Sequence, residues 1–339
     1  MHLGGTVRLN KIGVAVVCGI IIVMILYMSP RSGSPFDSAS AKVNLRRLLL
    51  VSIEAAEKGG REVVKVINQA NLKEESKGET KEGVKVPVTN ADYKSHCVMY
   101  YGIKNTFPTV KVISEEKKGE NECQHLPPME IEQLEKTTGI ENLADFEANS
   151  EHVTVWIDPL DATKEYTEGL YQYVTTMVCV AYQGNPIIGV IHKPFGPEPK
   201  TTWAWVHIGM SKHLNHNKPK SDKKVVMISK SHPGKVKTLV QDVFGEDTGI
   251  VPAGGAGYKA LEVATGNVTA YLHNTEISKW DVCAGDVIIS ALEGSFSTLD
   301  GNDLDYSASS DPVNKDGILA TLDKADLYIQ KLKEIRKTY

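Results

Sequence analysis

The chain has 339 residues and a formal net charge of −4, with 41% hydrophobic residues. This hydrophobic fraction is ordinary for a globular protein with a core. A slightly acidic chain lacks the basic surface through which proteins bind nucleic acid, so we expect no nucleic-acid partner. The five cysteines show no C-x-x-C spacing, which excludes the usual zinc and redox motifs, and they are too few for a disulfide scaffold.

The N-terminal residues differ in composition from the rest of the chain. Residues 12–28, IGVAVVCGIIIVMILYM, form an uncharged apolar run, and Arg8 and Lys11 precede it. The run is at the short end of what spans a bilayer, and the basic residues favour a cytosolic N-terminus. We therefore predict a cytosolic tail at 1–11 and an uncleaved transmembrane signal anchor at 12–28.

The residues after this run are small and turn-forming, which predicts a flexible stem at 29–42. The alternative is a cleaved signal peptide, with processing at Ala39–Ala41. Both interpretations place the domain at 43–339 in the lumen of the secretory pathway. In that compartment Asn267, in the sequence NVT, would be a glycosylation acceptor.

The first part of the domain shows helical spacing of apolar residues from Leu45, which resumes after Gly59-Gly60. Thr89 as N-cap and Asp92 three residues later form a capping-box pattern and predict a second helix. VKVIS, which ends at Ser114, predicts a strand. Residues 117–150 are charged and irregular, and we expect a loop or lid there.

A buried strand, VTVWI, is predicted to lead directly into Asp158. YVTTMVCVAY and IIGVIHKPF flank the turn sequence QGNP and predict an antiparallel pair, and TWAWV and KVVMIS extend the series of strands. VPAGGAGYKALEVATG predicts a strand end, a glycine-rich turn and a helix. A last helix is predicted from Asp281 to Gly294. This alternation predicts a layered domain of mixed α and β structure.

Two aspartates three residues apart, Asp158 and Asp161, follow the predicted buried strand. The proline between them stiffens the turn, so both carboxylates and the carbonyl of Leu160 can face one point. Such oxygen ligands are preferred by Mg²⁺, and Glu115 and Asp281 are candidates to complete the set. Taken singly, each of these acids also has an ordinary interpretation as a turn, surface or helix-cap residue.

Two motifs resemble signatures of the Mg²⁺-dependent, lithium-sensitive phosphatases related to inositol monophosphatase. WIDPLDAT is similar to D-P-[ILV]-D-[GA]-[ST], and KWDVCAGDVI is similar to W-D-x-x-[AG], over a resemblance covering about residues 43–335. The resemblance implies an α/β/α/β/α sandwich behind the transmembrane helix, with two or more Mg²⁺ ions and inhibition by Li⁺. The metal ligands that it implies are Glu115, Asp158, the carbonyl of Leu160, Asp161 and Asp281.

The same resemblance implies that Thr163 and Asp92 orient and deprotonate the attacking water. Ala162 stands where many family members have glycine. We expect this alanine to leave phosphate binding intact if its φ is negative.

ISKSHPGK and PAGGAGYK resemble nucleotide-binding segments of the 3′-phosphoadenosine 5′-phosphate phosphatases. Lys259 also lies near the start of a predicted helix, where free N–H groups favour an anion. The substrate-binding residues implied are Ala162, Thr163, Ser229, His232, Gly255 and Lys259.

Together with the anchor, these segments imply a single-pass type II protein of the Golgi membrane. It would release AMP and phosphate from this small-molecule nucleotide, a by-product of sulfotransferases. The alternatives are a lumenal phosphatase for inositol phosphates or other small bisphosphates, and a membrane-tethered binding protein without activity. The sequence leaves the oligomeric state open.

Overall fold

In this computed structural model the described residues are 41–70, 72–79, 85–117, 123–134, 140–214, 223–230 and 233–336. All of them except Ala41 belong to the unit Lys42–Tyr339. The predicted tail, the anchor and nearly all of the stem lie outside the described residues, as does His232. None of the described helices is long and apolar enough to cross a membrane.

The first sheet contains six strands in the described part of the chain, in the order β10-β9-β8-β7-β6-β4. They are β4 (Lys111–Ser114), β6 (Val153–Asp161), β7 (Thr175–Tyr182), β8 (Asn185–Lys193), β9 (Lys200–Trp205) and β10 (Gly209–Met210). Neighbours are antiparallel except β4 and β6, which are parallel. The predicted β7–β8 pair is confirmed. Gln183 and Gly184 join the pair with φ of 51° and 81°, as a two-residue hairpin turn requires.

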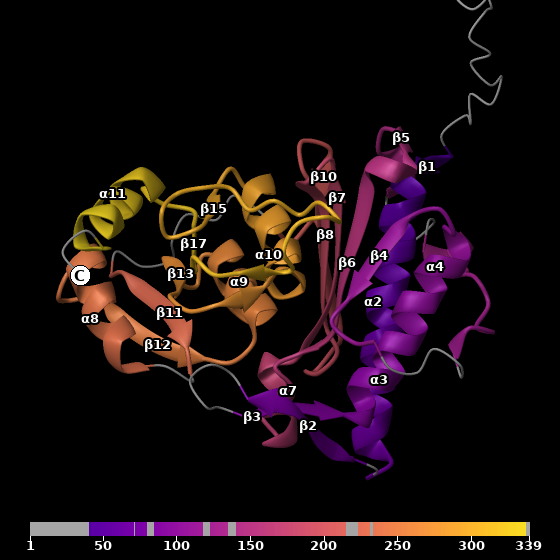
Figure 1. Ribbon diagram of the computed structural model, residues 1–339, viewed down its shortest axis with the longest axis horizontal. Helices are drawn as coiled ribbons and strands as arrows, with labels where there is room; N and C mark the ends of the chain where they lie inside the picture. The colour runs from indigo at the N-terminus through magenta and orange to yellow at the C-terminus, as the bar shows by residue number, and fades with distance from the viewer. Residues whose placement is uncertain are drawn as a thin grey trace, which may run out of the picture. The chain divides into compact units, whose positions relative to one another are not determined.

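Helix α2 (Leu45–Asn68) covers one face of this sheet (Figure 1). The predicted helical spacing is confirmed, and the helix continues through Gly59-Gly60 without a break. The Asn44 side chain caps its start by accepting from Arg47 N at 2.8 Å. The apolar face of α2 packs against β7 and β8, and each large side chain buried there stabilises the fold by about 1.5–3 kcal/mol.

The second sheet has the order β12-β11-β13-β17-β15 among the described strands. These are β11 (Val225–Ser229), β12 (Gly249–Ala253), β13 (Ala270–His273), β15 (Ser295–Ser297) and β17 (Ile318–Thr321). Strands β12, β11 and β13 are parallel, so their carboxyl ends meet at one edge. KVVMIS therefore forms part of the second sheet and does not continue the first.

Helices α9 (Ala256–Ala264) and α10 (Lys279–Ala291) lie between the two sheets (Figure 1). Helices α8 (Pro233–Phe244) and α11 (Ala325–Arg336) cover the far face of the second sheet, where Val240 and Tyr328 are buried. The order of layers within this unit is thus the predicted α/β/α/β/α. The middle layer carries the largest apolar cluster of the described residues, and that cluster holds α10 against the first sheet.

Short elements border the sheets. A hairpin of β2 (Glu74–Glu79) and β3 (Lys85–Thr89) precedes α3 (Asn90–His96), η1 (Cys97–Tyr101) and α4 (Gly102–Thr106). Between the layers, β14 (Ile277–Ser278) pairs with β16 (Val313–Asn314). The remaining short elements are β1 (Lys42–Asn44), η2 (Ile140–Asn142), β5 (Glu147–Asn149), η3 (Ser150–His152), α7 (Thr163–Thr167) and η4 (Tyr171–Tyr173).

The segment at 117–150 is more ordered at its end than the sequence predicted. Its last residues form η2 and β5, and β5 pairs with β1, where Val43 lies opposite Ala148. A disulfide joins Cys123 in this segment to Cys97. The expectation of an irregular loop is therefore wrong for residues 140–142 and 147–150, while a lid function stays a prediction.

Two disulfides connect described residues that are distant in the sequence. Cys97–Cys123 spans 26 residues, and Cys179–Cys283 spans 104 residues and joins β7 to α10. The sequence analysis did not find them, because cysteine spacing alone does not determine connectivity at such separations.

Candidate active site

Asp158 and Asp161 lie at the end of β6, where the pairing with β7 becomes irregular. Asp158 is 1% exposed, and its Oδ1 accepts from Leu160 N at 3.1 Å. Among the described residues no donor reaches Oδ2 of this side chain. An ionised carboxylate oxygen without a partner is unfavourable in a buried position, and a bound cation would satisfy it.

Asp161 is held by the first turn of α9. Its carboxylate accepts from Ala256 N at 3.1 Å, Gly257 N at 2.8 Å and Thr175 Oγ1 at 3.0 Å. The anion at this helix N-terminus is therefore Asp161 itself. Gly255 caps the helix with φ of 65°, and a Cβ there would meet Tyr173 O at 2.6 Å, so the turn requires glycine.

Ala162 links β6 to α7 in a left-handed conformation, with φ of 68° and ψ of 43°. The condition attached to the expectation of intact phosphate binding, a negative φ at this residue, is therefore not met. An alanine in this conformation costs about 1–2 kcal/mol relative to the right-handed region.

Thr163 and Asp92 meet beside this turn. Thr163 Oγ1 lies 2.9 Å from Asp92 Oδ1 and 3.0 Å from the carbonyl oxygen of Leu160, and it can donate to either. The predicted capping box is confirmed, because Thr89 N and Oγ1 both donate to Asp92 Oδ2 at 2.7 Å. Burial raises the pKa of Asp92 to about 6, against the lowering effect of the Thr89 hydrogen bonds. Asp92 is thus poised to accept a proton near neutral pH.

Glu115 follows β4, and its backbone N–H donates to Ile157 O at 3.1 Å. Lys77, from strand β2 of the hairpin, lies 2.9 Å from Glu115 Oε1 and also pairs with Glu116. Burial, together with the charge of Glu115, raises the pKa of Glu116 to about 7. A lysine ammonium therefore neutralises this part of the acidic cluster. The sequence analysis missed Lys77 because nothing in its local pattern points to residues 115 and 116.

Asp281 lies in the first turn of α10. The helix begins at Lys279 and ends at Ala291, so both the predicted start at Asp281 and the predicted end at Gly294 are wrong. Ser278 is the N-cap, and Asp281 Oδ2 accepts from its backbone N–H at 3.2 Å, which completes a capping box. Ser278 and Asp281 show the same spacing as Thr89 and Asp92, so the start of this helix was marked in the local sequence as well.

The carboxylates of Glu115, Asp158, Asp161 and Asp281 share one electrostatic environment. Burial raises the pKa of Asp158 and of Asp281, and the charge of Glu115 raises both further. In the described part of the structure, no three histidine, cysteine or acidic side chains are arranged to hold a metal ion. The donor chemistry nevertheless fits Mg²⁺, because the set consists of hard oxygens and includes the unpartnered Oδ2 of Asp158.

Lys259, in α9, is 4% exposed. Its Nζ donates to the carbonyl of Gly255 at 2.6 Å and lies 4.9 Å from the centre of the Tyr271 ring. Burial lowers the pKa of Lys259 to about 8, and the nearby charge of Asp161 opposes this effect. The amine is therefore an interior cation facing the acids, deeper than the helix-surface position that its sequence context suggested.

Ser229 ends β11 and lies in register with Ala253 at the end of β12. The parallel pairing of these strands brings Ser229 beside the turn at 254–257, which in turn donates to Asp161. The structure thus gathers most of the predicted site residues at one edge of the second sheet and at the end of β6. The predicted role of His232 stays a prediction.

A model of the inositol monophosphatase family matches residues 44–337, nearly the whole folded unit. The chain belongs to this family, and it is a phosphatase. The family that the two motifs resembled is thereby confirmed.

Relatives match the chain over almost its full length. Inositol monophosphatase 3 of Danio rerio is 46% identical over 333 residues, covering 93% of each chain. Putative inositol monophosphatase 3 of Drosophila melanogaster is 42% identical over 353 residues, covering 99% of this chain and 97% of its own. The Golgi-resident adenosine 3′,5′-bisphosphate 3′-phosphatase of Homo sapiens is 38% identical over 363 residues, covering 98% of each.

Solved structures share the fold. The extragenic suppressor protein suhB from Bartonella henselae superposes with a TM-score of 0.62 at 19% identity, covering 86% of this chain and all of its own. An IMPase/NADP phosphatase complexed with Mg²⁺ and phosphate gives 0.58 at 17% identity, covering 80% and 90%. At these identities the likeness establishes the fold alone.

Proposed function

We propose that this phosphatase removes the 3′-phosphate of 3′-phosphoadenosine 5′-phosphate in the Golgi lumen and releases AMP and phosphate. The observation that carries the proposal is the position of Ser229 beside the turn at 254–257, whose amides hold Asp161. A ligand with two phosphates can then contact this turn and the acidic cluster together. The Golgi-resident relatives at 38–40% identity act on adenosine 3′,5′-bisphosphate by name, which supports this substrate.

We propose that the acidic cluster binds two or more Mg²⁺ ions and that Li⁺ inhibits the enzyme. The ligands would be Glu115, Asp158, the carbonyl of Leu160, Asp161 and Asp281. When bound, Mg²⁺ would supply positive charge to the phosphate oxygens and lower the pKa of a water molecule. The solved relative complexed with Mg²⁺ and phosphate is consistent with this assignment.

The chain's own residues provide the proton transfer. A water beside Thr163 would pass a proton through the hydroxyl to Asp92, whose Oδ1 is 2.9 Å away. The water oxygen would bond to phosphorus as the bond from phosphorus to the ribose 3′ oxygen breaks, and that oxygen would take up a proton from solvent, to which Asp92 would return the proton that it accepted. Phosphoryl transfer depends mainly on positioning and charge, so no covalent intermediate is required.

Substrate selection is proposed to involve Ala162, Thr163, Ser229, His232, Gly255 and Lys259. Because Lys259 is buried, its charge acts from beneath the turn at 254–257. The relatives named inositol monophosphatase 3, at 41–46% identity, support a second candidate, an inositol phosphate. A binding protein without activity is disfavoured, because every side chain of the proposed ligand set is present.

Phosphate release from a panel of substrates tests the choice. We expect faster release from 3′-phosphoadenosine 5′-phosphate than from inositol monophosphate, dependence on Mg²⁺, and inhibition by Li⁺. Lys259→Ala should reduce kcat/KM for the nucleotide about tenfold to a hundredfold, with Lys237→Ala on the exposed face of α8 as the control. A preference for inositol monophosphate would overturn the nucleotide assignment. An equal loss on both substrates in the Lys259 variant would remove its selective role.

The proposed location has a separate test. We propose a type II protein of the Golgi membrane that is anchored by residues 12–28 with the catalytic domain in the lumen. Carbonate washing should leave it in the membrane fraction, and protease outside sealed vesicles should leave the domain intact. Digestion of the domain in sealed vesicles would place it in the cytosol.

A further inference from the structure

A row of three residues crosses the first sheet beneath α10. Trp156 on β6 lies opposite Cys179 on β7, and Cys179 lies opposite Gly189 on β8. Residues that are directly opposite in antiparallel strands project to the same face of the sheet. A continuous row of three residues, Trp156, Cys179 and Gly189, therefore faces α10 in the middle layer.

Helix α10 is attached to this row at three points. The ring of Trp280 lies 6.4 Å from that of Trp156, and Cys283 forms a disulfide with Cys179. At Gly189 the helix backbone is so close that a Cβ would meet the carbonyl oxygen of Ala284 at 2.6 Å. Of these three attachments, only the one through Cys283 is covalent.

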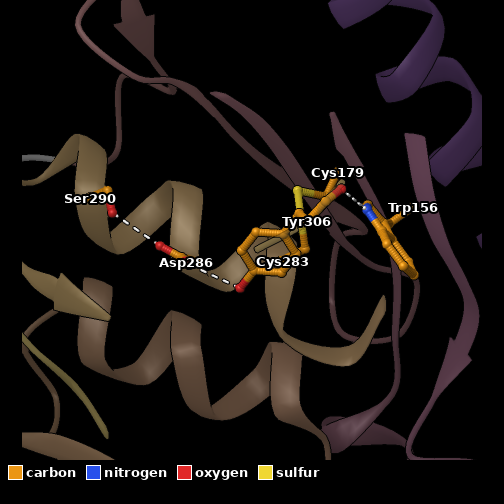
Figure 2. The surroundings of a disulfide bond; sticks show 6 residues. All are labelled: Trp156, Cys179, Cys283, Asp286, Ser290 and Tyr306. Atoms are coloured by element: carbon orange, nitrogen blue, oxygen red, sulfur yellow. Dashed lines mark hydrogen bonds between the residues drawn. A yellow bond between two sulfur atoms is a disulfide. The ribbon is translucent and has the colours of Figure 1, made fainter. Parts of the chain in front are cut away.

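Tyr306 forms a second bridge between the helix and the sheet (Figure 2). Its hydroxyl donates to Asp286 Oδ2 on α10 at 2.9 Å, and its carbonyl accepts from Trp156 Nε1 at 2.9 Å. Ser290 donates to the other oxygen of Asp286 at 3.1 Å. A noncovalent connection from α10 to β6 through Tyr306 thus accompanies the covalent link from α10 to β7.

These attachments lie next to proposed metal ligands on both sides. Trp156 is two residues before Asp158, and Cys283 is two residues after Asp281. Asp158 and Asp281 would both ligate the proposed Mg²⁺, so the geometry of that site depends on how α10 is held against the first sheet. The covalent link from α10 to β7, the strand that pairs with β6 at Trp156 and Asp158, holds this geometry.

We propose that Cys179 and Cys283 are positioning residues for the metal site, whose disulfide keeps Asp281 beside Asp158 when no cation is bound. The inference rests on the proposed Mg²⁺-dependent function. Without the disulfide, the cost of returning α10 to the sheet would offset part of the free energy of metal binding. The affinity for Mg²⁺ should therefore fall, while turnover at saturating Mg²⁺ should change little, because the bound geometry is the same.

The test compares two disulfide deletions in the full-length protein. Cys179→Ala/Cys283→Ala removes the link between β7 and α10. Cys97→Ala/Cys123→Ala is the matched control, since that disulfide includes neither β6, β7 nor α10. Calorimetry with Mg²⁺ alone should show the dissociation constant rising about tenfold or more in the first variant, as for other groups that orient metal ligands. The control should bind Mg²⁺ like the wild type.

A third variant separates the covalent link from packing. Cys179→Val/Cys283→Ala restores apolar volume but no bond, and we expect its Mg²⁺ affinity to stay low. Wild-type affinity in this variant, or equal losses in both disulfide deletions, would overturn the inference. Failure of the wild-type protein to bind Mg²⁺ would instead overturn the proposed function.

If the Cys179 and Cys283 variants do not fold, reduction provides the same comparison. The Cys97→Ala/Cys123→Ala protein is treated with a phosphine reductant until the thiols of Cys179 and Cys283 titrate. Mg²⁺ affinity is then measured before reduction, after reduction and after reoxidation. A reversible loss of affinity supports the inference, and unchanged affinity in the reduced, folded protein contradicts it.

Discussion

Thr163 Oγ1 lies 2.9 Å from Asp92 Oδ1, although 71 residues separate the two in the chain. The other oxygen of Asp92 is occupied by two hydrogen bonds from Thr89. The carboxylate is thereby held at the start of α3 with one oxygen directed at the threonine. This hydrogen bond connects the first turn of α3 to the turn after β6. It defines the path of the proposed proton transfer.

Asp92→Asn should lower kcat by about 10²- to 10⁴-fold, because the side chain can no longer accept a proton. The asparagine oxygen can still accept from Thr89, so the melting temperature should stay near that of the wild type. Thr163→Val should lose activity similarly, and Thr163→Ser, which keeps the hydroxyl, should retain most of it. Phosphate release and thermal unfolding provide the measurements. Normal turnover in Asp92→Asn would show that another group takes the proton.

Asp158→Asn should abolish Mg²⁺-dependent activity and yet stabilise the metal-free protein. The substitution removes a buried charge that Glu115, Asp161 and Asp281 repel. Each kcal/mol gained should raise the melting temperature by roughly 2–4 °C, and added Mg²⁺ should no longer raise it further. Asp303→Asn, at an exposed position, is the control. A lower melting temperature without Mg²⁺ would mean that the carboxylate is stabilised in a way that the structure does not show.

Lys77→Met should strengthen Mg²⁺ binding. The lysine ammonium lies 2.9 Å from Glu115 Oε1 and competes with a metal ion for that oxygen. The pair is partly exposed, so its removal should be worth at most about 1 kcal/mol, or roughly fivefold in the Mg²⁺ concentration for half-maximal activity. Lys73→Met, near the start of the same hairpin, should leave this concentration unchanged. A higher Mg²⁺ requirement in Lys77→Met would indicate that the lysine supports the bound state.

Asp286→Asn should change how stability depends on pH. Burial raises the pKa of Asp286 to about 7, so the folded protein holds this proton more tightly than the unfolded chain. Its ionisation therefore reduces stability progressively as pH rises from about 4 to about 7, and the loss is complete above that range. The asparagine resembles the protonated acid and can still accept from Tyr306.

The variant should consequently be more stable than the wild type at pH 8, by up to about 4 kcal/mol from 1.36 kcal/mol per pKa unit. At pH 4 the two proteins should be nearly equal. Denaturant unfolding at both pH values measures the difference. A constant difference between pH 4 and pH 8 would show that Asp286 does not titrate in this range.

Much of the fold and part of the site could be predicted from local patterns. The spacing of apolar residues from Leu45 predicted α2, and Thr89 with Asp92 predicted the start of α3. The turn QGNP predicted the pairing of β7 with β8. In each case the signal lies within a few residues, because a helical turn, a cap and a tight hairpin are formed by near neighbours in the chain.

The remaining features depend on contacts across the layers. The pairing of Lys77 with Glu115 joins residues 38 positions apart, so the local sequence does not indicate it. The burial of Lys259 was also not predicted, because the turn at 254–257 and the second sheet produce its environment.

The sequence by itself determined most of the helices and strands and supplied the proposed site residues, including Asp158 and Asp161 after a buried strand. Only the tertiary structure decided how those side chains meet: Thr163 at Asp92, the first turn of α9 at Asp161, and Cys283 at Cys179. The physical reason is the distance along the chain over which each kind of interaction acts. Backbone hydrogen bonds and periodic burial act within one element, whereas these contacts exist only after the sheets and helices have packed and brought distant segments together.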